Sequence, residues 1–210
     1  MKDQLVSEKL FGITVTRRSH NLVTPYIKEG DTVVDATLGN GSDAAFLAER
    51  IGSDGTLYGF DIQKEAVEMT RKRLSAEKQM SSEPKPAKCK LLLFTESHDK
   101  MNELVRETPS VIMFNLGYLP GGDKEITTVP ETTLPAIRKG LSLLKSGGVM
   151  SIVTYKGHPG AMEEHRLVTD FLAKLSPKEF EVLSFIQTNR SESTPELHLI
   201  QKTPSSAEAL

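Results

Sequence analysis

The sequence predicts an α/β fold built on a mostly parallel sheet. Short apolar runs typical of strands alternate along the chain with amphipathic segments typical of helices. The first apolar run leads straight into a glycine-rich turn at residues 39–41, and the fourth, residues 111–114, is apolar throughout. Uniform apolarity is typical of a parallel strand that is covered on both faces. With 210 residues the chain has room for one such domain and little more.

The first elements are two strand–helix units behind a lead-in helix. Residues 19–29 are expected to form that lead-in helix. The apolar run 32–37 is the first strand, and the glycine-rich turn after it opens a helix at 42–51. The run 56–61 is the second strand, and a helix at 63–78 gathers its small and apolar side chains on one face.

The middle of the chain adds two strands and a long connection. Serine and proline residues make 81–86 a surface loop, and the apolar segment 89–95 is the third strand. A short helix is expected near 99–106, before the fourth strand at 111–114. The connection at 115–129 is longer than compact domains usually contain, so we expect it to be functional.

The last part of the chain completes the sheet. A helix at 131–145, a strand at 148–155 and a helix at 161–174 continue the alternation. Strands at 180–189 and 196–202 follow too closely for a crossover helix, so they are expected to pair antiparallel at one edge. Five strand–helix units and a hairpin match the Rossmann-like class I S-adenosylmethionine-dependent methyltransferase plan, a seven-stranded, mostly parallel sheet with a C-terminal antiparallel hairpin.

Composition and charge exclude several classes of protein. A net charge of -2 is not that of a protein that clings to long nucleic acid, and one cysteine, Cys89, permits neither an internal disulfide nor a cysteine zinc cluster. No apolar run approaches the ~20 residues of a membrane span, and the first residues lack a secretory signal, so a cytoplasmic location is expected. The five histidines are scattered without a paired helical spacing, so no metal is expected.

The expected domain occupies residues 19–203, between an N-terminal extension at 1–18 and a tail at 204–210. Arg17 and Arg18 in the extension are interpreted as solvated rather than as phosphate contacts. The sequence leaves the oligomeric state open, a homodimer included.

The glycine-rich turn predicts a nucleoside-bearing cofactor. Gly39 and Gly41 would let backbone approach the ligand, and Asp61 at the tip of the second strand would accept from ribose hydroxyls. A dinucleotide site has a third glycine that lets the helix pack closely under the pyrophosphate. That glycine is absent here, so Ala44 or its neighbour would have to take the packing role. Asp43, at a helix N-terminus, would repel a diphosphate but suits the cationic end of S-adenosylmethionine. An ordinary turn capped by Ser42 is the simpler alternative.

Polar clusters follow the carboxyl ends of the expected strands, where open α/β sheets bind their ligands. These clusters lie at residues 37–43, 61–63, 96–99, 115–123 and 155–158. Their convergence on one edge is stronger evidence for a site than any one motif.

The segment after the fourth strand, Asn115-Leu116-Gly117-Tyr118, resembles the Asn/Asp-Pro-Pro-Tyr signature of amine-directed methyltransferases. There a carboxamide oxygen or a backbone carbonyl accepts from the attacking amine and aims its lone pair at the methyl group. Tyr118 would shelter the reacting nitrogen or stack on a base. With Leu-Gly in place of Pro-Pro, a planar nucleobase amine is a less secure substrate than another amine.

Taken together, these motifs resemble one bacterial family. The segments are 35–43, 59–63, 97–100, 114–124 and 130–133, and the Asn-Leu-Gly-Tyr-Leu-Pro-Gly-Gly-Asp-Lys string in the fourth is highly specific. They are similar to those of the YtqB-like rRNA methylase family, the MnmM-type tRNA wobble-uridine methyltransferases. The resemblance covers about residues 19–202. It implies that the 5-aminomethyl group of wobble 2-thiouridine, in a tRNA anticodon stem-loop, receives a methyl from S-adenosylmethionine.

The resemblance also implies roles for individual residues. Cofactor binding falls to Asn40, Asp43, Asp61, Gln63, Ser97 and His98, with Gly39 added by the turn itself. Catalysis falls to Asn115 and Tyr118, and substrate binding to Gly121, Gly122, Asp123, Lys124 and His158. The proton acceptor stays open among Asp99, Asp123 and His158. The alternatives are a class I methyltransferase for an rRNA base, a protein amine or a small molecule, a nicotinamide-dependent oxidoreductase, and a noncatalytic RNA-binding module.

Overall fold

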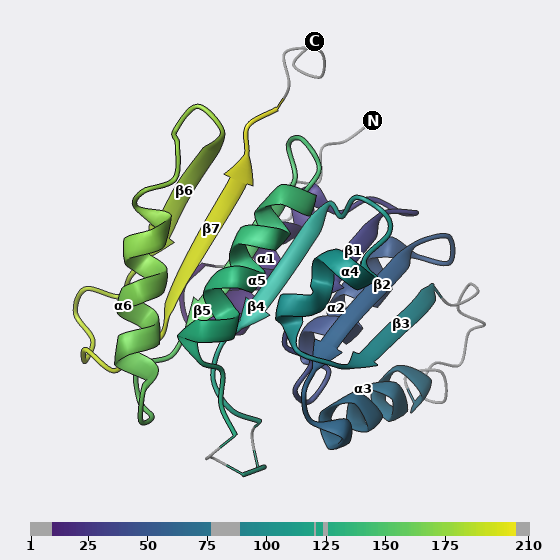
Figure 1. Cartoon of the computed structure of the whole chain (residues 1–210), viewed down its shortest axis with the longest axis horizontal. Helices are drawn as coiled ribbons and strands as arrows, with labels where there is room; N and C mark the ends of the chain where they lie inside the picture. Colours follow the sequence, from purple (N-terminus) through teal and green to yellow (C-terminus); the bar gives the residue numbers. More distant parts are fainter. Residues whose placement is uncertain (1–9, 77–88, 120, 124–125, 205–210) are drawn as a thin grey trace.

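The computed structural model describes residues 10–76, 89–119, 121–123 and 126–204. Within them, seven strands form one sheet in the order β3-β2-β1-β4-β5-β7-β6 (Figure 1). The strands are β1 Thr32–Asp35, β2 Thr56–Asp61, β3 Lys90–Thr95, β4 Val111–Asn115, β5 Val149–Thr154, β6 Phe180–Phe185 and β7 Glu196–Lys202. Strands β1 to β5 are parallel, and β7 runs antiparallel between β5 and β6. The predicted fold class and its C-terminal hairpin are confirmed.

Helices cover both faces of the sheet. The first face carries α1 Val15–Val23, α2 Ser42–Ile51 and α3 Lys64–Ala76, and the second carries α4 Met101–Leu104, α5 Pro130–Leu143 and α6 Ala161–Leu172. In the view of Figure 1, α5 and α6 lie in front of the sheet and α1 lies behind it. Two short 3-10 turns, Thr24–Tyr26 and His98–Lys100, follow α1 and precede α4.

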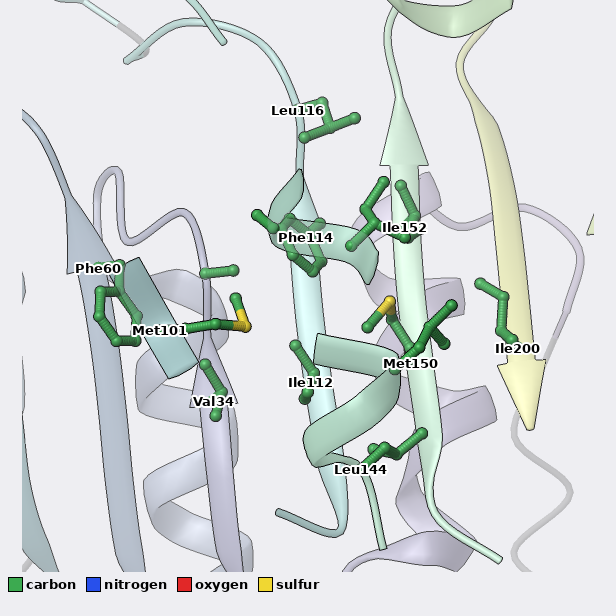
Figure 2. Close-up of a cluster of buried hydrophobic side chains, with 14 of the residues drawn as sticks. Val34, Phe60, Met101, Ile112, Phe114, Leu116, Leu144, Met150, Ile152 and Ile200 are labelled. Atoms are coloured by element: carbon green, nitrogen blue, oxygen red, sulfur yellow. The ribbon is translucent and has the colours of Figure 1, made fainter. Parts of the chain in front are cut away.

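The core under α4, α5 and α6 shows why the strands are so apolar. Figure 2 shows Ile112 and Phe114 of β4 beside Met150 and Ile152 of β5, all pointing to the same side. Residues between them, such as Met113, join a second core under α1 to α3. Because side chains alternate between the faces, a strand buried on both faces needs apolar residues at every position. Each large side chain so buried contributes about 1.5–3 kcal/mol.

The lead-in helix is displaced from its predicted position. Helix α1 starts at Val15, where the Thr14 side chain accepts from the backbone N–H of Arg17 as an N-cap. It ends at Val23, because Pro25 follows and lacks the N–H that a continuing helix would need. Helix α1 therefore crosses the boundary expected after residue 18. The last strands also differ slightly, since β6 ends at Phe185 rather than near 189.

The carboxyl ends of β1 to β5 meet at one edge of the sheet. The connection from β4 to α5 projects from this edge (Figure 1). Among the described residues, no helix is long and apolar enough to cross a membrane. The expected loop at 81–86, residue Lys124 and the tail beyond Pro204 lie outside the described residues.

Candidate active site

A cavity of about 1470 Å³ opens at the carboxyl edge, lined by the ends of β2 and β4, by the loops that follow β1 to β5, and by α1. Most of the predicted site residues line it: Gly39, Asn40, Asp43, Asp61, Gln63, Ser97, His98, Asn115, Tyr118, Gly121 and His158. Gly122 and Asp123 are exposed and do not line it, and Lys124 is outside the described residues. The fold thus brings together residues that are up to 119 positions apart, from Gly39 to His158.

The two glycines of the first turn have different tasks. A Cβ on Gly39 would lie 3.9 Å from both Leu119 Cδ1 and Thr37 O, which is ordinary van der Waals contact, and Gly39 lines the cavity wall. A Cβ on Gly41 would lie 2.9 Å from Thr70 Oγ1 and 3.0 Å from Thr70 Cα of α3. Gly41 therefore serves the packing of α3 against the turn. The roles predicted for Gly41 in ligand approach and for Ala44 or its neighbour in place of the third glycine stay predictions.

Asn40 and Asp61 shape the same turn. The Asn40 side-chain oxygen accepts from Ser42 N at 3.2 Å, an Asx turn that opens α2. The N-cap position itself is Gly41, so the capping role considered for Ser42 is absent. The Asp61 carboxylate accepts from Gly39 N at 3.0 Å and from Gln63 N at 2.9 Å. A carboxylate has about four lone-pair sites, so Asp61 retains acceptor capacity on the cavity wall.

The region near α2 carries two acids, Asp35 and Asp43. It also carries His20, which the sequence did not mark as a site residue. Asp43 is buried, and its Oδ1 lies 2.6 Å from Nε2 of His20 on α1. Asp35, at the end of β1, is fully buried. Burial raises the pKa of Asp35 well above its ordinary value, and the negative charges of Asp43 and Asp61 add to the effect.

His98 lies on the cavity wall with one ring nitrogen engaged. Its Nδ1 contacts the carbonyl oxygen of Ala36 at 3.2 Å. Because a carbonyl only accepts, Nδ1 carries the proton, which leaves Nε2 as an acceptor. Burial lowers the pKa of His98 and so favours this neutral form. Nε2 is buried and has no partner among the described residues, so it can accept from a ligand N–H or O–H.

Asn115 ends β4 with its side-chain oxygen unused. Its backbone N–H donates to Thr37 Oγ1 at 2.7 Å, which joins the tips of β4 and β1. Its Oδ1 is buried and has no hydrogen-bond partner within the described part of the chain. A buried amide oxygen without a partner costs free energy, about 1–3 kcal/mol, and an N–H from a bound molecule would offset that cost.

Buried Glu164 of α6 holds the loop that follows Asn115. One of its carboxylate oxygens accepts from Thr128 Oγ1 at 2.7 Å, and the other from Thr133 Oγ1 at 2.6 Å. Thr128 in turn accepts from Gly117 N at 2.9 Å and returns its own N–H to the Gly117 carbonyl. Glu164 thereby ties both ends of the loop to α6. Sequence reasoning missed it, since nothing in the helix pattern marks an inward-facing glutamate.

Tyr118 and His158 face each other in the part of the cavity formed by the loops after β4 and β5, which is called the acceptor side below. Their rings meet edge to face, with centroids 5.7 Å apart and an interplanar angle of 86°. His158 Nδ1 lies 3.1 Å from the carbonyl of Pro159, which leaves Nε2 as the lone-pair nitrogen. Of the three candidate proton acceptors, His158 lines the cavity, whereas Asp99 and Asp123 do not.

Arginine side chains surround the cavity mouth. Arg17, Arg50 and Arg73 are exposed and line it, and the guanidinium of Arg50 lies 5.5 Å from the ring centroid of Phe46. Arg18, by contrast, donates to the carbonyl of Leu10. The mouth therefore offers cationic groups that fit a phosphate backbone, and Arg17 is better placed for such contacts than the sequence suggested.

This geometry agrees with the matches to known proteins. Residues 57–201 match the model of a family described as "Putative rRNA methylase". The chain belongs to this rRNA methylase family. A crystal structure of a protein of the same description, from Clostridium thermocellum, is 38% identical, with a TM-score of 0.83 over 90% of this chain and 98% of that one.

Two further relatives of this rRNA methylase family member are informative. A "putative methyltransferase" from Streptococcus mutans, solved in complex with SAH, is 31% identical with a TM-score of 0.75, covering 88% of this chain and 95% of that one. The chloroplastic tRNA (mnm(5)s(2)U34)-methyltransferase of Arabidopsis thaliana is 40% identical over 182 residues, 83% of this chain. The chain spans 65% of the length of that plant protein.

Proposed function

We propose that this protein is an S-adenosylmethionine-dependent methyltransferase that N-methylates the 5-aminomethyl group of wobble 2-thiouridine in tRNA. The observation that carries the proposal is the Oδ1 of Asn115, which is buried in the wall of the cavity and has no partner among the residues that the structure describes. This acceptor stands where an amine N–H can satisfy it. The plant relative, named for this tRNA reaction, supports the choice of substrate.

The cavity fits S-adenosylmethionine better than a dinucleotide. Asp61 keeps acceptor capacity for ribose hydroxyls, Gly39 lines the wall without a side chain, and His98 Nε2 offers an acceptor to an amine or hydroxyl. The buried carboxylate of Asp43 lies in the first turn of α2, where a nicotinamide cofactor would place its diphosphate. Negative charge at that point favours a cationic ligand over an anionic one. The SAH-bound relative from Streptococcus mutans supports the same choice.

The acceptor must reach the methyl donor as a neutral amine. S-adenosylmethionine supplies the methyl group when bound. An aliphatic ammonium has an ordinary pKa near ~10, and desolvation inside the cavity lowers it. Asn115 Oδ1 accepts one N–H and thereby orients the nitrogen lone pair, while Tyr118 and His158 wall off the opposite side.

His158 is the proton acceptor in this proposal. Its Nε2 carries the lone pair, and a side chain built on Gly117 would lie 3.7 Å from it. The nitrogen therefore borders the loop that follows Asn115, which we call the acceptor loop. An imidazole nitrogen with a free lone pair can take up the proton that the amine releases and pass it to solvent. Gly121, Gly122, Asp123 and Lys124 are proposed as substrate contacts along the same loop.

The arginines at the mouth would hold the phosphates of the anticodon stem-loop. A short structured RNA needs only a local cationic patch, which is consistent with the net charge of -2. A domain spanning residues 19–203, a homodimer and a cytoplasmic location stay predictions.

Mass analysis of tRNA nucleosides tests the function. The purified chain is incubated with S-adenosylmethionine and tRNA that carries 5-aminomethyl-2-thiouridine, and the methylated nucleoside is the expected product. Ribosomal RNA and unmodified tRNA serve as competing substrates. Methylation of either, with the aminomethyl nucleoside untouched, would assign the enzyme to another substrate.

Calorimetry tests the cofactor site separately. Asp61→Ala should weaken S-adenosylmethionine binding by ~10–100-fold, because a hydrogen bond to a charged group contributes roughly 1.5–3 kcal/mol. Asp54→Ala, in the loop before β2, is the matched control. Unchanged affinity in a well-folded Asp61→Ala protein would remove Asp61 from the site, and tighter binding of NAD than of S-adenosylmethionine would refute the proposed cofactor.

A further inference from the structure

Two histidines and a glutamate meet between α6 and the hairpin of β6 and β7. They are His165 of α6 and Glu196 and His198 of β7, and the ligand atoms that they offer all lie within 4.8 Å of one another. His165 Nε2 is 3.8 Å from Glu196 Oε2, and the two imidazole rings have centroids 6.2 Å apart. The rRNA methylase cavity does not include any of the three.

The fold itself creates this cluster. Glu196 and His198 are two residues apart on one strand, so both point to the same face. Cross-strand pairing places Thr154 of β5 opposite Glu196, and Ser184 of β6 opposite His198. Helix α6 covers this face and contributes His165. The scattered histidine positions in the sequence gave no sign of this meeting.

Hydroxyl groups orient both imidazole rings. His165 Nδ1 lies 2.9 Å from Thr154 Oγ1, and His198 Nδ1 lies 2.8 Å from Ser184 Oγ. Each contact leaves Nε2 as the remaining nitrogen. His198 is 1% exposed, and its Nε2 has no partner in the described part of the chain. Metal-binding histidines typically have their second nitrogen fixed by such a contact.

We propose that His165, Glu196 and His198 form a binding site for a divalent transition-metal ion of the zinc type. Two imidazole nitrogens and one carboxylate oxygen are a donor set that zinc accepts, with a water as fourth ligand, whereas calcium and magnesium prefer oxygen alone.

A surface cavity gives an ion access to the cluster, and a lysine pairs with the other oxygen of the Glu196 carboxylate. A cavity of about 330 Å³ reaches His165 and Glu196 from the surface. Lys156 pairs with Glu196 Oε1, which leaves Oε2 on the side of His165. An ion held by these three residues would join α6 to β7. The site is independent of the proposed methyl transfer.

Zinc titration of the full chain, purified without a histidine tag and stripped with a chelator, tests the proposal. We expect one zinc per chain by elemental analysis, a higher Tm with zinc than without it, and visible absorption bands when Co²⁺ replaces zinc. His165→Gln and Glu196→Gln should each weaken zinc binding by about 100-fold, measured against a competing chromophoric chelator. Circular dichroism checks that each variant is folded.

His158→Gln is the matched control, because it removes a histidine from the same edge but outside the cluster. It should still bind one zinc with unchanged affinity. A wild-type chain that binds no stoichiometric zinc overturns the proposal. Equal zinc affinity in wild type and in the folded Glu196→Gln and His165→Gln variants also overturns it, since the ion would then be bound adventitiously elsewhere.

Discussion

His20 Nε2 and Asp43 Oδ1 lie 2.6 Å apart, although the two residues belong to different helices and are 23 positions apart. Both side chains are buried, and the His20 ring stacks on Phe46 with a centroid distance of 4.0 Å. The contact joins α1 to the first turn of α2 at the wall of the cavity. It makes the segment before the first strand part of the site.

A double-mutant cycle measures this contact. His20→Gln and Asp43→Asn should each destabilise the protein, and the double variant should lose less than the sum of the two. The expected coupling is about 0.5–3 kcal/mol, the range for residues in direct contact. Urea unfolding of the four proteins gives the value. Additive losses would show that the two side chains do not support each other.

The raised pKa of Asp35 predicts a pH dependence of stability. A carboxyl whose pKa is higher in the folded than in the unfolded chain contributes stability below its unfolded value, and this contribution is lost as pH rises through the folded pKa. Asp35→Asn cannot lose a proton. The variant should therefore gain stability relative to wild type as pH increases, by up to ~1.4 kcal/mol per pH unit between the two pKa values.

Urea unfolding of wild type and Asp35→Asn from acidic to mildly alkaline pH checks this sign. Asp54→Asn, an exposed carboxyl in the loop before β2, is the control and should follow the wild-type profile. Parallel profiles for Asp35→Asn and wild type would contradict the raised pKa of Asp35.

Asn115→Ala should lower turnover by ~10–1000-fold, a fraction of what positioning of reactants can supply. The affinity for S-adenosylmethionine should change much less, because the lost Oδ1, which has no partner in the described parts of the chain, is proposed to contact the amine rather than the cofactor. Methyl incorporation into tRNA that lacks only the last wobble modification gives the rate. Tyr118→Phe, which keeps the ring against His158, should be the milder change. Near-normal turnover by Asn115→Ala would remove this residue from the reaction.

Glu164→Ala should loosen the acceptor loop without touching the cavity, since Glu164 does not line it. The loss of the carboxylate leaves the hydroxyls of Thr128 and Thr133 without their acceptor, which costs about 1–3 kcal/mol for the buried Thr133 and less for the half-buried Thr128. We expect a raised KM for tRNA and a lower kcat, with S-adenosylmethionine affinity nearly unchanged. Thr133→Val removes one of the two bonds and should have the smaller effect. Equal kinetics for wild type and Glu164→Ala would limit Glu164 to a structural role.

The sequence predicted the strands well because their signals are local. Apolar runs such as residues 111–114 and the turn at Gly39 report burial and backbone geometry that neighbouring residues decide. Strand ends carry the polar clusters, so the rule that ligands bind at carboxyl edges was enough to gather most cavity residues. The start of α1 escaped prediction because it depends on one capping side chain, Thr14.

The sequence alone thus determined the alternation of strands and helices. It also determined which polar residues stand at the carboxyl edge, including the motif that begins at Asn115. The tertiary structure decided which distant side chains meet: His20 with Asp43, Glu164 with the acceptor loop, and His165 with Glu196 and His198. It also placed Gly41 where α3 packs against the turn, and it left the Asn115 oxygen without a partner among the described residues. The reason is physical. Periodicity records which face of an element is buried, whereas a contact between two elements depends on their register and separation, which the packed sheet and helices fix together.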